Sequence, residues 1–142
     1  MGDTGDYRVS VKAVVYREDG TILAIRRSKT APTRPLQWDI PGGELEYGES
    51  LIDGVRRETR EETGLEGEKV DLLDAIARFN DKQEFWTAIC YAVKAETADV
   101  KLSYEHDDYR WVTPEEFEVI QPSSRNTEFV AAFAKRKDEF IV

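Results

Sequence analysis

The chain has 142 residues, a formal net charge of −9 and a single cysteine. This length predicts one domain, residues 1–142, that can bury a core without disulfide bonds. One cysteine and one histidine exclude a disulfide framework and a metal centre built from several of these residues.

Charge and hydropathy also exclude classes of partner. The acidic balance disfavours DNA or RNA polymers, which need a basic face, but it allows a phosphorylated small molecule if metal cations lie between protein and phosphate. No apolar run approaches the roughly 18 residues of a membrane span, so no membrane partner is expected. Residues 1–6 are polar and acidic, unlike a signal peptide, and are expected to be flexible. These features favour a soluble cytoplasmic protein.

The first part of the chain predicts a hairpin followed by a loop. Residues 9–16 alternate as expected for a strand with one face in the core, residues 18–20 read Glu-Asp-Gly and predict a turn, and residues 21–27 form the second strand. Residues 28–37 contain two prolines and are expected to be a loop, and residues 38–40 a short extended segment.

The best helix pattern in the chain covers residues 50–63, after a Pro-Gly-Gly sequence at residues 41–43 that is typical of a tight turn. Ser50 is a preferred N-cap, and Asp53 gives an acidic variant of the capping box. Gly64 stands where a helix-ending glycine belongs.

The second half of the chain predicts two longer strands at residues 70–79 and 84–94 and a short strand at residues 109–112. A short helix should open at residues 113–116, and a final amphipathic helix should cover residues 126–139. Thr113 would cap the first of these helices, and Pro114 would occupy its first position. Strands and helices in this order predict an α/β domain with helices packed on a mixed sheet.

Three glutamates share one face of the helix predicted at residues 50–63. Glu58, Glu61 and Glu62 are spaced i, i+3 and i+4. The neighbouring sector is assigned to the sheet and holds Ile52, Val55 and Thr59. Close carboxylates repel one another unless a cation lies between them, and carboxylate oxygen is a preferred ligand of Mg²⁺ and Mn²⁺. The alternative is a solvated helix face stabilised by ion pairs with neighbouring arginines.

The frame around these glutamates resembles the Nudix box, G-x5-E-x7-R-E-U-x-E-E-x-G-U, in which U is aliphatic. The chain matches it over residues 43–65 with Gly43, Glu49, Arg57, Glu58, Glu61, Glu62, Gly64 and Leu65. One position departs, because Thr59 stands where the family prefers an aliphatic residue. Thr59 is near valine in size and belongs to the sheet-facing sector, so the departure concerns packing more than chemistry.

The resemblance extends over most of the chain, about Tyr7 to Glu139. Residues 38–43, Trp-Asp-Ile-Pro-Gly-Gly, are similar to the family's usual lead-in, and residues 105–112 are similar to a segment of MutT-type members. The resemblance implies the Nudix fold, an α/β/α sandwich with a mixed β-sheet between helices.

The resemblance also implies an activity and a cofactor. Nudix hydrolases cut within the phosphate chain of a nucleoside diphosphate linked to another moiety, by attack of water on phosphorus, and the cofactor would be Mg²⁺ or Mn²⁺. The implied metal ligands are Glu58, Glu61, Glu62, the backbone carbonyl of Gly42 or Gly43, and Glu49 as an outer or alternate ligand.

Catalytic roles follow from the same resemblance. Arg57 would orient the catalytic glutamates, and its i,i+4 spacing to Glu61 is compatible with an ion pair. The general base would be Glu58, Glu62 or Glu105, because the base varies across the family. Glu105 is equally well explained as a solvated loop residue.

Three residues are candidate substrate contacts, and each also has a structural interpretation. Trp38 could stack on a nucleobase, although tryptophans more often fill cores or sheet faces. Asn126 resembles a base-contacting asparagine of MutT-type enzymes, and it also fits a helix N-cap. Arg26 belongs to a basic cluster that could contact the phosphate chain or offset the acidic surface, with Arg27, Lys29 and Arg34. The lone His106 is expected on the surface or in a hydrogen bond.

A nucleoside triphosphate is the favoured substrate, as for a MutT-like pyrophosphohydrolase. The alternative is an ADP-ribose or nucleotide-sugar pyrophosphatase, but those enzymes often carry a proline downstream of the box, and this chain has none between Pro41 and Pro114. A catalytically silent nucleotide-binding module is disfavoured because all the box carboxylates are kept. Dimers are common in the family, so a homodimer is an option, although no residue pattern indicates an interface.

Overall fold

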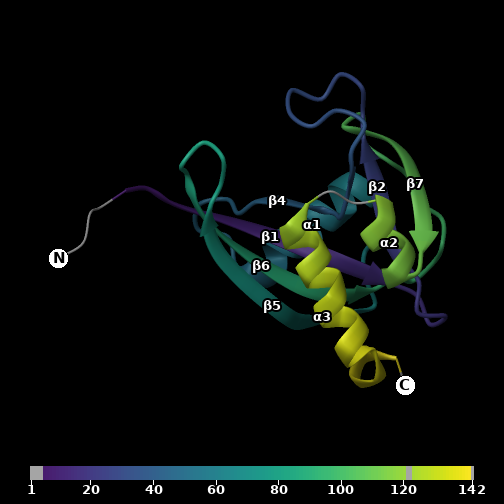
Figure 1. Cartoon of the computed structure of the whole chain (residues 1–142). Helices are drawn as coiled ribbons and strands as arrows, with labels where there is room; N and C mark the ends of the chain where they lie inside the picture. The colour runs from purple at the N-terminus through teal and green to yellow at the C-terminus, as the bar shows by residue number, and fades with distance from the viewer. Residues whose placement is uncertain (1–4, 121–122, 142) are drawn as a thin grey trace.

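Strand β1 is the centre of a seven-stranded mixed sheet in the computed structural model, which describes residues 5–120 and 123–141 (Figure 1). The strands are β1 (Tyr7–Tyr16), β2 (Ile22–Arg27), β3 (Trp38–Asp39), β4 (Gly42–Glu44), β5 (Lys69–Phe79), β6 (Phe85–Lys94) and β7 (His106–Val112). Strand β1 runs parallel to β6 along its whole length, and β6 pairs with antiparallel β5. On the other side, β2 pairs with β3 and β7.

The edge of β1 that faces β2 is shared between two strands. Tyr16 pairs with Ile22 of β2, whereas Ser10, Val11 and Lys12 pair with β4. The predicted hairpin is therefore present, but β2 leaves β1 soon after the turn. Strand β4 occupies the edge that this divergence leaves open, so the glycines expected in a tight turn form a short strand instead.

Helices cover both faces of this sheet (Figure 1). The helices are α1 (Leu51–Thr63), α2 (Pro114–Ile120) and α3 (Ser124–Phe140). Helix α1 packs on one face, where Val55 joins the core, and α2 and α3 pack on the other face, where Phe117 and Phe133 join a second core. This arrangement confirms the α/β/α sandwich. Within the described ranges, no helix has the length and apolar content needed to cross a membrane.

Strand β1 corrects the expectation of a strand with one buried face. Every residue from Ser10 to Tyr16 is buried. Val11 and Val15 belong to the core beneath α1, whereas Val14 and Tyr16 belong to the core beneath α3. A central strand of a three-layer sandwich has helices on both faces, so neither of its faces reaches solvent.

Helix α1 begins and ends where the sequence predicts, but the face of the helix that is buried differs from the predicted face. Ser50 Oγ accepts a hydrogen bond from Asp53 N (3.1 Å), and the helix ends at Gly64 in the left-handed conformation (φ +76°). Ile52, which was assigned to the sheet, is 40% exposed. The buried residues are Gly54, Val55, Thr59, Glu62 and Thr63. A Cβ at Gly54 would lie 2.7 Å from Leu45 Cδ1, so this glycine allows the loop before α1 to pack closely.

The structure confirms the predicted N-cap of α2 and corrects the predicted N-cap of α3. Thr113 and Glu116 form a reciprocal capping box at the start of α2, with hydrogen bonds of 3.0 and 3.1 Å. Helix α3 is capped by Ser123, whose Oγ accepts from Asn126 N (3.4 Å), so the interpretation of Asn126 as the N-cap is wrong.

Strand β7 begins earlier than predicted, because His106 is already part of it. His106 is buried rather than on the surface, and its Nδ1 has no hydrogen-bond partner within the described part of the chain. Burial lowers the pKa of His106 to about 4, so the imidazole is neutral at physiological pH.

A buried polar network joins β1, β3 and α3. Lys12 Nζ donates to Ile40 O (2.9 Å) and lies 3.4 Å from Asp39 Oδ1, and Asn126 Nδ2 donates to the same carboxylate oxygen (2.6 Å). Burial alone would raise the pKa of Asp39, but the positive charges of Lys12 and Arg34 lower it below its ordinary value. Asp39 is therefore an anion inside the protein, compensated chiefly by Lys12.

We expect Lys12→Met to destabilise the metal-free protein by about 3 kcal/mol, because it leaves the Asp39 charge buried without its main counter-charge. The double variant Lys12→Met/Asp39→Asn should recover at least half of this loss. Urea unfolding followed by tryptophan fluorescence measures both. Equal stability of Lys12→Met and the unmodified protein would contradict the expectation.

Candidate functional site

The glycines of β4 allow an unusually close approach of three segments. A Cβ at Gly42 would lie 2.2 Å from Val11 O, and Gly42 has a φ of +150°. A Cβ at Gly43 would lie 2.6 Å from Glu58 Oε1. Only residues without a side chain let β4 lie on β1 while α1 presents its carboxylates against it.

Glu62 is the deepest of the three box glutamates on α1. It is 7% exposed, and its Oε1 accepts a hydrogen bond from Gly42 N (2.9 Å). Burial raises the pKa of Glu62 to about 8, although the charge of Lys12 and the Gly42 N–H lower it in part. In the metal-free protein this carboxyl group is largely protonated at neutral pH.

Glu58 lies one turn earlier on α1, next to Gly43. Burial raises its pKa, Arg57 lowers it in part, and the negative charges of Glu61 and Glu105 raise it further. Glu105, the exposed candidate base before β7, therefore acts electrostatically on the same site. Glu61 points to the rim, where its side chain is 56% exposed.

Arg57 holds these carboxylates in place from within α1. Its guanidinium donates to both oxygens of Glu49 (2.7 and 3.0 Å), to Glu58 Oε1 (2.8 Å) and to Glu61 Oε2 (3.3 Å). The predicted i,i+4 pair with Glu61 is confirmed, but the bidentate pair with Glu49 is shorter. Hydrogen bonds from Arg57 lower the pKa of Glu49, so Glu49 is an anion.

The donor atoms fit a hard divalent cation. Glu58 and Glu62 bring carboxylate oxygens to β4, and the missing Cβ of Gly43 leaves room for the Glu58 carboxylate. Burial disfavours the charged forms of both glutamates until a cation is present. Among the described residues, no three acidic, histidine or cysteine side chains already form a group that could hold an ion. Glu58 is instead paired with Arg57.

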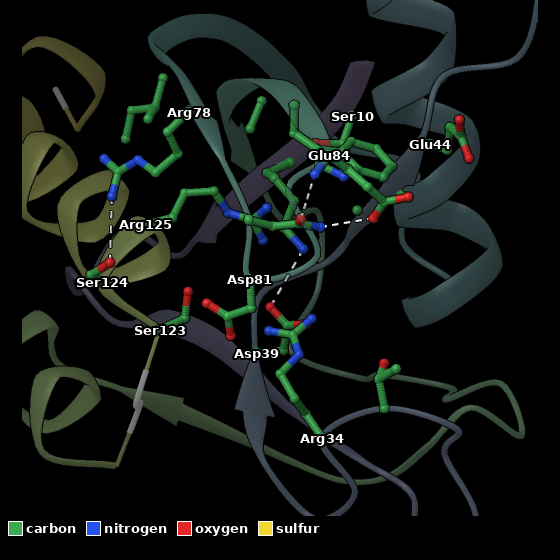
Figure 2. Close-up of a pocket in the computed structure, with 18 of the residues that line it drawn as sticks. Ser10, Arg34, Asp39, Glu44, Arg78, Asp81, Glu84, Ser123, Ser124 and Arg125 are labelled. Atoms are coloured by element: carbon green, nitrogen blue, oxygen red, sulfur yellow. Dashed lines mark hydrogen bonds and ion pairs between the residues drawn. The ribbon is translucent and has the colours of Figure 1, made fainter. Parts of the chain in front are cut away.

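A cleft of about 830 Å³ opens on the other side of β4. One wall is formed by β1 and β4, through Ser10, Lys12, Gly42, Gly43 and Glu44. The opposite wall comes from the loop before β3, the β5–β6 hairpin and the first turn of α3, and Figure 2 shows Arg34, Arg78 and Arg125 extending from these three segments. The volume falls within the range of small-molecule sites.

None of the three predicted substrate contacts lines this cleft. The ring of Trp38 contacts two arginines, with Arg26 Cζ 5.9 Å and Arg110 Cζ 4.7 Å from its centroid. Arg26 also pairs with Asp107 at 2.8 Å. Asn126 is fully buried and its amide nitrogen donates to Asp39, and its contact with a base stays a prediction. Of the predicted basic cluster, Arg27 and Arg34 line the cleft, and Arg26 and Lys29 do not.

Sequence reasoning assigned no role to three charged residues that line the cleft, which are Lys12, Arg78 and Arg125. Lys12 did carry a signal, because a lysine inside the otherwise apolar run of residues 11–15 requires a buried partner. Arg78 and Arg125 carried none, because an isolated arginine in a strand or a helix is usually a surface residue.

Gly42→Ala should destabilise the fold, whereas Gly43→Ala should mainly weaken metal binding. Gly42→Ala meets a backbone carbonyl at a φ that L-residues rarely adopt, so it should lower the free energy of unfolding by about 3 kcal/mol or more. The nearest atoms to a Cβ at Gly43 belong to the Glu58 carboxylate, which can move, so Gly43→Ala should stay within about 1 kcal/mol of the unmodified protein. It should nevertheless weaken Mn²⁺ binding measured by calorimetry. Equal loss of stability in the two variants would contradict this distinction.

The pKa of Glu62 predicts a specific pH dependence for the protein in EDTA. Between pH 4.5 and about 8 the unfolded chain releases a proton that folded Glu62 retains, so this group's contribution to stability is lost as the pH rises. Glu62→Gln should therefore be more stable than the unmodified protein by about 1–4 kcal/mol at pH 8.5 and nearly equal to it at pH 5. Urea titrations at both pH values test this, and a difference that does not change with pH would refute it.

The comparisons with known proteins match this geometry. The sequence model of the NUDIX domain family matches residues 6–133. A MutT-like protein of Streptomyces ambofaciens is 37% identical over 110 residues, which cover 78% of this chain and 66% of that protein, slightly less than two thirds of its length. The nucleoside triphosphatase NudI of Salmonella arizonae is 30% identical over 116 residues, with coverage of 72% and 80%.

A solved structure is similar over nearly the whole chain. The crystal structure of the MutT protein from Methanosarcina mazei Go1 has a TM-score of 0.80 and 35% sequence identity, and the match covers 92% of this chain and 95% of that one. The matched family, the relatives and the similar fold all agree with a site formed by the glycines of β4 and the glutamates of α1. The chain therefore belongs to the Nudix hydrolase family and is of the MutT-like kind.

Proposed function

We propose that this protein is a metal-dependent hydrolase that cleaves the phosphate chain of a nucleoside triphosphate by attack of water on phosphorus. The observation that carries the proposal is the contact of Glu58 and Glu62 with the two glycines that form one wall of the cleft. A triphosphate is favoured over other nucleotides because a relative that aligns over 72% of this chain and 80% of its own length is named a nucleoside triphosphatase.

Mg²⁺ or Mn²⁺ would be held by Glu58, Glu61, Glu62 and the Gly43 carbonyl, with Glu49 as an outer ligand. Such ions offset the repulsion between glutamates and a polyanionic phosphate chain, stabilise the charge that develops on the leaving phosphate and lower the pKa of water. The carboxylate chemistry of the site fits this cofactor, because hard divalent cations prefer carboxylate oxygen.

The chain's own residues have three tasks in this proposal. Arg57 orients Glu49 and Glu58 through its short ion pairs, which keeps both carboxylates directed at the reaction centre. Glu58, Glu62 or Glu105 accepts the proton of the attacking water. The cleft binds the nucleotide on the side of β4 away from α1, where its lining carries more cationic than anionic side chains.

The proposal predicts turnover that depends on Mg²⁺ and on Glu62. Phosphate and pyrophosphate release should be measured over nucleoside triphosphates, ADP-ribose, nucleotide sugars, dinucleoside polyphosphates and coenzyme A. Triphosphates should be the best substrates, and Glu62→Gln should lower kcat by about 10²–10⁴-fold. Glu139→Gln, which removes an exposed carboxylate paired with Arg136, is the matched control and should leave kcat unchanged.

Two results would change the proposal. Preferred turnover of ADP-ribose or a nucleotide sugar would replace the triphosphate with the alternative substrate class. No turnover of any compound with Mg²⁺ or Mn²⁺, by protein shown to be folded, would favour a catalytically silent nucleotide-binding module.

A further inference from the structure

Three arginines from different parts of the chain line the wall of the cleft opposite β4. Arg34 comes from the loop between β2 and β3, Arg78 from the end of β5, and Arg125 from the first turn of α3 (Figure 2). The chain as a whole carries a charge of −9, so a local concentration of positive charge in this cleft is not a consequence of composition. Clefts lined by one sign of charge concentrate ligands of the opposite sign.

Arg125 has no carboxylate partner within 4 Å in the described part of the chain. Its guanidinium contacts Asn126 Oδ1, a neutral acceptor, at 3.3 and 3.4 Å. Its pKa is lowered by burial and by the positive charges of Arg34 and Arg78, although Asp39 raises it in part. A half-buried guanidinium without an ion pair is unfavourable unless a ligand supplies the missing negative charge.

Asp39, the carboxylate whose negative charge acts on Arg125, is already compensated. It receives hydrogen bonds from Lys12 and Asn126 and from the backbone N–H of Ile40. The network therefore leaves Arg125 directed at the cleft instead of neutralising it. Asn126 links the two, because its amide nitrogen donates to Asp39 while its oxygen accepts from Arg125.

Arg34 reaches the cleft from a strained backbone. Its φ is +49°, and Leu36, two residues later, has a φ of +62°. Neither residue is a glycine, so each conformation is strained, and such strain is typical of ligand clamps. The loop is held by backbone hydrogen bonds of 2.9 Å between Leu36 N and Arg27 O and between Arg27 N and Gln37 O. No ion pair involves Arg34 among the residues that the structure describes.

Arg78 completes the set but is partly neutralised. It pairs with Glu128 at 2.7 Å and contacts Ser124 Oγ at 3.4 Å, which holds it beside the first turn of α3. Two acids of the β5–β6 hairpin also line the cleft. Glu84 pairs with Arg8 at 2.6 Å, and Asp81 forms no ion pair with any of the three arginines. Positive charge therefore remains in excess at this wall.

We propose that Arg34, Arg78 and Arg125 form a second anion subsite, which binds a phosphate group attached to the ribose of the nucleotide, such as a 3′-phosphate. The inference rests on the proposed function for its orientation: with the scissile phosphates at β4, the nucleoside end of the substrate lies against the opposite wall. Guanidinium groups on one wall of a cleft match a phosphate, which accepts bidentate hydrogen bonds, better than they match a neutral base.

The same ribose phosphate could belong to a free nucleotide or to the first phosphodiester of a short oligonucleotide. Adenosine 3′,5′-bisphosphate and the dinucleotide pApA therefore serve as two probes, with 5′-AMP as the reference, and the guanosine series repeats the comparison for a second base. None of these compounds contains a phosphoanhydride, so calorimetry of the full chain can include Mg²⁺ without turnover.

The bisphosphate should bind at least tenfold more tightly than 5′-AMP or 5′-GMP. Arg125→Gln and Arg34→Gln should each remove most of this preference, because each should weaken binding of the bisphosphate far more than binding of 5′-AMP. Arg125→Lys, which keeps the charge but loses the planar fork, should retain an intermediate preference. Lys29→Gln, an exposed lysine of the same loop that does not line the cleft, is the matched control.

Tighter binding of pApA than of the bisphosphate would identify an oligonucleotide end as the source of the phosphate. Equal affinity for mono- and bisphosphates, no measurable binding of either, or a preference that both arginine variants retain would overturn the inference. If Arg125→Gln does not fold, Arg34→Gln gives the same test from the loop.

The outcome is separable from that of the proposed function. A bisphosphate preference in a protein that hydrolyses nothing would refute the proposed function alone. Triphosphate hydrolysis without the preference would refute the subsite alone.

Discussion

The close contact between the glycine strand β4 and helix α1 is the constraint on which the rest of the structure depends. It brings Glu62 to the N–H of Gly42 and Glu58 to the space beside Gly43. To make this contact, α1 turns a carboxylate toward the sheet, and Ile52 is left exposed as a result. The same rotation buries Thr59, where the Nudix box has an aliphatic residue; its Oγ1 has no hydrogen-bond partner within the described ranges. Helix α1 therefore departs from an ordinary amphipathic helix, because it buries polar side chains and exposes an apolar one in order to form the site.

The two sides of β4 carry opposite kinds of charge. On the α1 side, carboxylates are crowded and partly desolvated, and Arg57 is the cation that keeps Glu49 and Glu58 in a fixed arrangement. On the cleft side, positive charge predominates, and Lys12 stands between the two regions because it contacts Asp39 and also lowers the pKa of Glu62. A polyanionic substrate that bridges metal ions and arginines would match both regions at once.

Local patterns predicted the elements well because their signals lie within a few residues. Helix α1 was predicted from Ser50 and Gly64, and the capping box at Thr113 located α2. What could not be predicted depends on contacts between distant segments. Strand β4 requires that β2 leave β1, and the burial of Asn126 requires Asp39, a residue 87 positions away. The box located the carboxylates, but no sequence pattern shows that α3 and β5 place arginines in the same cleft.

The division of the cleft between two sets of segments has an evolutionary consequence. The residues assigned to chemistry come from β4 and α1, which are packed tightly against the centre of the sheet. The residues that face them come from a loop, a hairpin tip and the start of a helix, where substitutions and insertions disturb little packing. Selection can therefore change which nucleotide is recognised without altering the hydrolytic machinery. A chain of this architecture can acquire new substrates through substitutions in the wall of the cleft opposite β4 while its reaction stays the same.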